Sequence, residues 1–151
     1  TNALLFNPDI ENWGFSYSNL FTIFLVPTVL SELDELKISH TNENVRRKSE
    51  KLIRKIKEYR RRGSLKDGVK IVENKVYLQS LAIEPNMNET LPWLDNQNND
   101  DRMLASVIDI MRSRPRSHVI LISRDINLQN KAEFASVPYD EPPDIENEKN
   151  S

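Results

Sequence analysis

Residues 119–132 read VILISRDINLQNKA, and this stretch decides the fold class. Its first four residues are continuously apolar, which is typical of a strand buried within a parallel sheet. Asp125 and Asn127 then lead into residues 128–135, where we expect a short helix. The stretch therefore predicts a buried strand that passes directly into a helix, with polar side chains at the junction.

The same strand–helix pattern occurs earlier in the chain. Residues 23–26 are apolar, and the proline that follows them suits the first turn of a helix, which we expect over residues 28–37. A second helix is predicted over residues 100–112, with inward positions at Met103, Leu104, Val107, Ile108 and Met111. Strands that alternate with helices indicate an α/β fold with a mainly parallel sheet.

Two segments lie between these patterns. Residues 69–72 and 76–81 flank a short polar turn, and together they predict a hairpin or an extended edge element. Residues 84–99 are rich in Asn, Pro and acids, which predicts a loop. We expect three apolar side chains of this loop to anchor it in the core, and we favour that role for Trp93 over a base-stacking platform: Leu91, Trp93 and Leu94.

The length of 151 residues fits one domain with a core of its own. We expect this domain over residues 1–139, followed at residues 140–151 by a disordered tail with five acids and one lysine. No apolar run approaches the roughly 18 residues that a membrane span needs. The absence of cysteine excludes disulfides, thiolate zinc sites and cysteine nucleophiles, and it fits a cytoplasmic protein.

A strongly basic helix is expected after residue 42. Residues 46–62 contain ten basic residues and only two acids, and apolar residues recur along one side. Asn42 or Asn44 can cap this helix, and Gly63 can end it. We expect the helix to bind RNA phosphates, although a solvated face or an acidic partner would also suit it. The expected RNA-binding residues are Arg54, Lys57, Arg60, Arg61 and Arg62.

Acids occupy the positions at which parallel α/β sheets bind ligands, beyond the carboxyl ends of strands. Asp125 follows the strand at 119–122, and Glu32 lies in the helix after the strand at 23–26. Asp100 and Asp101 open the helix predicted over residues 100–112. Each alone is explained as a helix cap or a solvated residue. Gathered at one edge, however, they would repel each other unless cations lay between them, and oxygen-only clusters select Mg²⁺ or Mn²⁺. The sequence thus favours divalent-metal phosphodiester chemistry.

Three phrases resemble the PIN-domain family in their order and spacing: VPTVLSELDELK at 26–37, NNDDRMLAS at 98–106 and VILISRDINLQNKA at 119–132. The resemblance is closest to bacterial PIN domains that stand alone or are joined to PhoH-type ATPases. It implies a three-layer fold in which helices flank a twisted, mainly parallel sheet. It also implies an endoribonuclease that cleaves single-stranded RNA through metal-activated water, with Mg²⁺ or Mn²⁺ as cofactor.

The resemblance assigns metal binding and catalysis to Glu32, Asp100 and Asp125, with Asp101 as a helper ligand. It implies that further residues orient the ligand shell: Thr1, Asn2 and Asn127. The family begins with a strand that ends in Asp-Thr-Asn, and Thr1-Asn2 matches the last two letters. We therefore expect the strand and its aspartate to precede Thr1.

One alternative is a catalytically inactive PIN-like domain that binds RNA or serves as a scaffold. A receiver-like phosphoacceptor domain is a less favoured hypothesis, because the chain lacks a suitable lysine at the end of a late strand. The three acids favour the nuclease, since a scaffold has no reason to hold mutually repelling carboxylates. RNA is the expected partner and a membrane is not. A homodimer, an inhibitory protein and a fused ATPase are left open as further partners.

Overall fold

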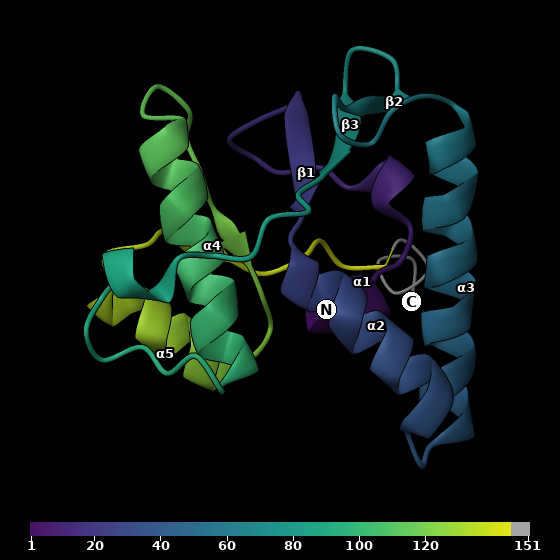
Figure 1. Ribbon diagram of the computed structural model, residues 1–151. Helices are drawn as coiled ribbons and strands as arrows, with labels where there is room; N and C mark the ends of the chain where they lie inside the picture. Colours follow the sequence, from purple (N-terminus) through teal and green to yellow (C-terminus); the bar gives the residue numbers. More distant parts are fainter. Residues whose placement is uncertain (146–151) are drawn as a thin grey trace. The chain divides into compact units, whose positions relative to one another are not determined.

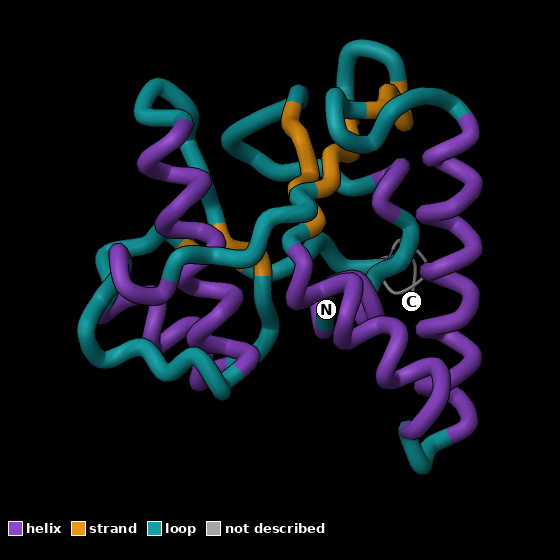
Figure 2. Tube along the Cα trace, viewed as in Figure 1, coloured by secondary structure: helices purple, strands orange, loops and turns teal. Residues whose placement is uncertain are grey.

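The computed structural model describes residues 1–145, which form two compact units (Figures 1 and 2). Of the described residues, the first unit comprises Thr1, residues 3–82 and residues 142–145, and the second comprises Asn2 and residues 83–141. Two of the three strand pairings found in these residues are parallel. The predicted α/β class with mainly parallel pairing is therefore confirmed.

The first unit contains a three-stranded sheet in the order β1-β3-β2. β1 (Phe21–Leu25) lies parallel to β3 (Val76–Ser80), and β2 (Val69–Val72) lies antiparallel to it. The predicted hairpin is therefore present, but its second strand is the central strand of the sheet rather than an edge. Val76 and Leu78 are completely buried, which favours the central position for this strand.

Helices α2 (Pro27–Ser39) and α3 (Glu43–Arg61) form a helical hairpin beside this sheet (Figure 1). α2 opens with a proline directly after β1, as the sequence predicts, because proline already has the helical φ angle. Asn42 caps α3, and its side chain accepts a hydrogen bond of 2.9 Å from the backbone N–H of Asn44. Of the two asparagines that the sequence offers as caps, Asn42 is therefore the N-cap of α3.

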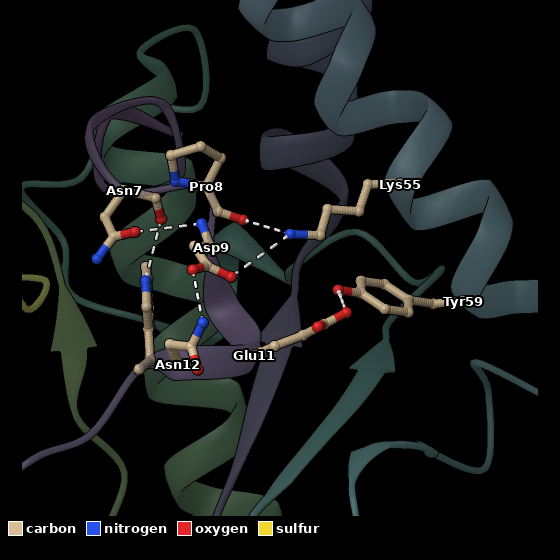
Figure 3. Close-up of polar contacts among 8 residues, drawn as sticks. Asn7, Pro8, Asp9, Glu11, Asn12, Lys55 and Tyr59 are labelled. Carbon is tan, nitrogen blue, oxygen red and sulfur yellow. Dashed lines mark hydrogen bonds and ion pairs between the residues drawn. The ribbon is translucent and has the colours of Figure 1, made fainter. Parts of the chain in front are cut away.

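The segment before β1 is tied to α3 by polar contacts (Figure 3). It contains two short helical turns, α1 (Asn2–Phe6) and η1 (Ile10–Asn12). Tyr59 is almost completely buried, and its hydroxyl donates a hydrogen bond of 2.7 Å to Glu11. Lys55 donates a hydrogen bond of 3.1 Å to the carbonyl oxygen of Pro8. One side of the basic helix therefore binds the N-terminal segment.

The second unit is built on two helices and a two-stranded parallel sheet. Its elements are α4 (Asn99–Ser113), β4 (Leu121–Ile122), α5 (Ile126–Phe134) and β5 (Tyr139–Asp140). Its core is made of buried apolar residues from these elements and their connections: Leu104, Val107, Leu121, Leu128, Ala132 and Val137. The helix predicted over 100–112 is confirmed, and the strand predicted over 119–122 is shorter than expected.

β5 differs from the sequence prediction, which placed a disordered tail from residue 140. Ile122 of β4 pairs with Asp140, and the carbonyl oxygen of Asp140 accepts a hydrogen bond of 3.0 Å from the N–H of Ser123. Pro142 is buried as well. Strand pairing uses backbone groups that every residue carries, so a polar sequence gives little sign of it. Residues 146–151 of the predicted tail lie outside the described residues.

The loop before α4 contains one short turn, η2 (Met87–Glu89). Leu94 packs against the core of the second unit, as predicted, whereas Trp93 is 47 % exposed. The prediction that Trp93 anchors the loop is therefore wrong. The N–H of Leu94 donates to the carbonyl oxygen of Leu91 at 3.1 Å, and in this tight turn Leu94 takes the inward position.

Candidate active site

Asp125 lies at the junction between β4 and α5. It is the N-cap of α5, and its carboxylate accepts a hydrogen bond of 2.8 Å from the N–H of Asn127. Its own N–H donates to the hydroxyl of the buried Ser123 at 3.1 Å. Capping and a buried neighbour thus hold this carboxylate at the carboxyl end of the strand, where α/β proteins bind ligands.

Asp100 lies in the first turn of α4 and is half-buried. Burial raises the pKa of its carboxyl above the usual value, and the negative charge of Asp125 raises it further. Lys131 opposes this shift of the pKa. The second unit therefore brings Asp100 and Asp125 close enough for each charge to act on the other.

Asp101 has a different environment, although it is the next residue in the sequence. Its side chain is buried, and one carboxylate oxygen accepts a hydrogen bond of 2.6 Å from the ammonium of Lys131. The other oxygen accepts 2.9 Å from the N–H of Asp95. Asp101 thus joins α4, α5 and the preceding loop. Lys131 and Asp95 were not identified from the sequence. Lys131 lies within the phrase at 119–132, but its partner Asp101 is 30 residues away, and Asp95 stands in no recognisable motif.

The residues expected to orient the site occupy different places. The side-chain amide of Asn2 donates to the hydroxyl of Ser123 at 3.5 Å, and its oxygen accepts from the N–H of Arg124 at 3.1 Å. Asn2 therefore supports the backbone directly before Asp125. Asn127 contributes its backbone N–H to Asp125, and its side chain is exposed. Thr1 belongs to the first unit.

Glu32 also belongs to the first unit, where it is half-buried on α2. The structure thus joins two of the predicted acids, Asp100 and Asp125, within one unit. Within residues 1–145, no three His, Asp or Glu side chains lie close enough together to hold a metal ion. The assignment of Glu32 as a metal ligand stays a prediction.

The sequence profile of the PIN domain matches residues 1–141, which is nearly the whole chain. The chain belongs to the PIN-domain family. No curated protein and no solved structure matches it significantly. The predicted family is confirmed, and the closer similarity to stand-alone or PhoH-associated members stays a prediction.

PIN domains are generally nucleases, and they generally use divalent metal ions. The donor chemistry of the second unit fits such an ion, because Asp100 and Asp125 offer hard carboxylate oxygens and repel each other without a cation. Asp101 is a poorer donor, since both of its oxygens already accept hydrogen bonds. None of the helices in residues 1–145 is both long and apolar enough to cross a membrane.

The first unit of this PIN domain has a cleft of about 530 Å³ between α2, α3 and the ends of β1 and β3. Leu25 and Ser80, the last residues of these two parallel strands, lie on its wall. Three cations also line it: Lys57, Arg60 and Lys66. The first two were expected to bind RNA, and Lys66 was not identified because it lies beyond the basic helix.

The other expected RNA-binding residues of α3 have contacts of their own. Arg54 forms an ion pair of 2.5 Å with Glu50, and Arg61 forms one of 3.3 Å with Glu58. The guanidinium of Arg62 lies over the ring of Tyr59, 5.1 Å from its centre. The basic segment is therefore divided between cations that line the cleft and cations that contact their own helix.

Proposed function

We propose that this PIN domain is an endoribonuclease that cleaves single-stranded RNA and depends on Mg²⁺ or Mn²⁺. The observation that carries this proposal is the pair Asp100 and Asp125, two mutually repelling carboxylates in the first turn of α4 and beyond the carboxyl end of β4. The negative charge of Asp125 acts on the half-buried Asp100, and a divalent cation held between the two carboxylates would remove this repulsion.

Asp100 and Asp125 would hold the divalent ion through carboxylate oxygens, which suits the hard cations Mg²⁺ and Mn²⁺. Such an ion supplies phosphodiester hydrolysis with a more acidic water and with positive charge for the phosphate. Asp101 and Lys131 would keep α4 and α5 in place. Asn2 would hold the backbone before Asp125 in place through its two hydrogen bonds.

The cleft of the first unit supports an RNA substrate. Lys57, Arg60 and Lys66 offer three positive charges to phosphates, against one negative charge from Asp34 on the same wall. The cleft also has apolar wall residues, which suit unstacked bases of a single strand better than a closed duplex: Leu25, Leu30, Ile53, Ile56 and Leu65. We therefore infer that this cleft contacts RNA.

The first experiment replaces Asp125 by asparagine and measures cleavage of an end-labelled single-stranded RNA in Mg²⁺ and in Mn²⁺. We expect a loss of about 100-fold or more, because a metal-binding carboxylate is removed. Asparagine is as good an N-cap as aspartate, so the melting temperature should not fall. Retention of full activity by D125N would show the proposal to be wrong.

Asp109→Asn is the matched control. Asp109 lies on the same helix as Asp100, and its carboxylate accepts a 3.3 Å hydrogen bond from the N–H of Asn86. The amide oxygen of asparagine can accept the same bond, so D109N removes one negative charge from α4 without touching the carboxylate pair. We expect D109N to cleave RNA at the wild-type rate.

The second candidate is a PIN domain that binds RNA without cleaving it. The finding that favours it is that residues 1–145 contain no group of three acids or histidines able to hold a metal ion. A wild-type protein that binds single-stranded RNA, yet leaves it intact in both Mg²⁺ and Mn²⁺, would establish this alternative.

A further inference from the structure

The two tryptophans of the chain have opposite environments. Trp13 is 2 % exposed, and its indole N–H donates a hydrogen bond of 3.0 Å to the carbonyl oxygen of Asn7. Trp93 is 47 % exposed. A large aromatic ring usually gains stability by burial, so an exposed one on an ordered loop suggests that it has something to bind.

The loop around Trp93 is fastened to α4 before the ring is reached. Glu84 forms an ion pair with Arg102, and Arg112 donates a hydrogen bond to the carbonyl oxygen of Glu89. Both arginines lie on α4. These contacts fix the incoming part of the loop, and a base that stacks on a fixed ring loses less entropy of the protein on binding.

The outgoing part of the loop is fixed to the candidate active site. Leu94 packs against the core of the second unit, and the N–H of Asp95 donates to Asp101 at 2.9 Å. Trp93 is two residues from Asp95, and two residues of extended chain span about 7 Å at most. The exposed ring is therefore close to the start of α4, where Asp100 lies.

Exposed polar groups follow the ring in the sequence. Asp95, Asn96 and Gln97 follow within four residues of Trp93, and all three are exposed. The side-chain amide of Gln97 donates to that of Asn96 at 3.2 Å. Protein-binding patches are contiguous and apolar. A single ring beside exposed amides instead matches a nucleobase, which offers a face for stacking and edges for hydrogen bonds.

We propose that Trp93 stacks on a base of the single-stranded RNA whose phosphate reaches Asp100 and Asp125. This inference rests on the proposed function for the class of substrate. It adds a positioning residue that holds one nucleotide beside the carboxylates. The stacking is tolerant of sequence, because every base has a π-face.

The experiment measures tryptophan fluorescence of D125N in Mg²⁺ while a single-stranded RNA oligonucleotide is added. Stacking should quench Trp93, and the buried Trp13 should not respond. W93F in the D125N background retains only Trp13 and should show no quenching. An oligonucleotide of the same length in which every nucleotide is abasic should quench little, because it retains the phosphates and lacks the bases.

Affinity and cleavage provide the second readout. W93A should bind the RNA roughly tenfold more weakly, W93F should retain part of the affinity, and both should melt at the wild-type temperature. F134A is the matched control, because Phe134 is 78 % exposed on α5 of the same unit and lies outside this loop. We expect F134A to bind RNA like the wild type.

The outcomes separate this inference from the proposed function. If D125N shows no quenching up to saturating RNA while the wild type cleaves, the role of Trp93 is wrong and the nuclease stands. If Trp93 is quenched and W93A binds weakly while the wild type never cleaves, the stacking role stands and the nuclease is wrong. If W93A alters only the sedimentation of the protein alone, Trp93 lies between copies of the chain and the inference is overturned.

Discussion

Two regions of the molecule differ in how their acids are partnered. One is the face of α3 that holds the N-terminal segment, and the other is the start of α4. On α3, the hydroxyl of Tyr59 donates a hydrogen bond to the carboxylate of Glu11 (Figure 3). The ammonium of Lys55 lies 4.0 Å from one carboxylate oxygen of Asp9. The other oxygen of Asp9 accepts a hydrogen bond of 2.6 Å from the side-chain amide of Asn12. At the start of α4, Asp100 faces the charge of Asp125. Even there the adjacent Asp101 has Lys131 as its partner.

This difference separates acids that stabilise the fold from acids that destabilise it. Glu11 and Asp101 join segments that are distant in the sequence, so their loss would loosen packing. Asp125 caps α5, but Asp100 and Asp125 also repel each other, and a bound cation would relieve this repulsion. The same comparison applies to the cations of α3, of which some have acidic partners and others line the cleft.

Among the tests of this comparison, the largest effect is expected when the cleft-lining cations of α3 are neutralised. The double variant K57Q/R60Q should bind single-stranded RNA about tenfold more weakly, and the slope of log affinity against log salt should fall by roughly 1.4 for two lost phosphate contacts. Filter binding over a range of salt concentrations measures both quantities. An unchanged slope would place the RNA contact outside this cleft.

R54Q/R61Q is the matched control for that experiment, because it removes the same amount of charge from the same helix. Arg54 and Arg61 form exposed ion pairs with Glu50 and Glu58, which contribute little to stability. We expect a salt slope close to the wild-type value. An equal loss of affinity in both double variants would mean that the whole helix acts as one diffuse basic surface.

Tyr59→Phe tests the face of α3 that holds the N-terminal segment. Burial and the hydrogen bond to Glu11 raise the pKa of Tyr59 above its usual range, so the hydroxyl stays protonated and keeps donating. Its loss should cost about 1.5 kcal/mol of unfolding free energy. Chemical denaturation measures this cost, and Y77F serves as the control, because the hydroxyl of Tyr77 makes no hydrogen bond among the described residues.

Asp100→Asn should give the smallest effect, and of opposite sign. Because the folded-state pKa of Asp100 is raised, its ionised form costs stability at neutral pH, and the cost disappears as the pH falls through that pKa. In metal-free buffer, D100N should melt about 1–3 °C above the wild type at pH 7. The difference should shrink toward pH 4. A D100N variant that melts lower at pH 7 would contradict the repulsion.

Several features were predicted from the sequence because their causes are local. Pro27 starts α2 directly after a strand, and Asn42 and Asp125 cap the helices that follow them. Such signals depend on a side chain and a backbone group two or three residues apart. The acids at the start of α4 and after β4 were predicted for the same reason, since strand ends and helix starts are visible in the pattern of apolar residues.

The different environments of neighbouring residues could not be predicted in this way. Asp100 and Asp101 are adjacent acids in one helical turn, yet only Asp101 forms an ion pair with Lys131, which lies 30 residues further along the chain. Trp93 and Leu94 are adjacent apolar residues, and only Leu94 turns inward. Helical and loop geometry send successive side chains to different sides, and a shift of one position reverses the outcome.

The amino-acid order alone was enough to predict the α/β class, the strand–helix junctions and the positions of the acids at the candidate site. These follow from residue types and from contacts within a few positions. Only the tertiary structure decided that β3 lies at the centre of its sheet, that β5 pairs with β4, and that Asp100 and Asp125 repel each other while Asp101 is neutralised. These outcomes depend on contacts between backbone groups and charges from distant parts of the chain, and no local sequence pattern indicates which distant groups come into contact.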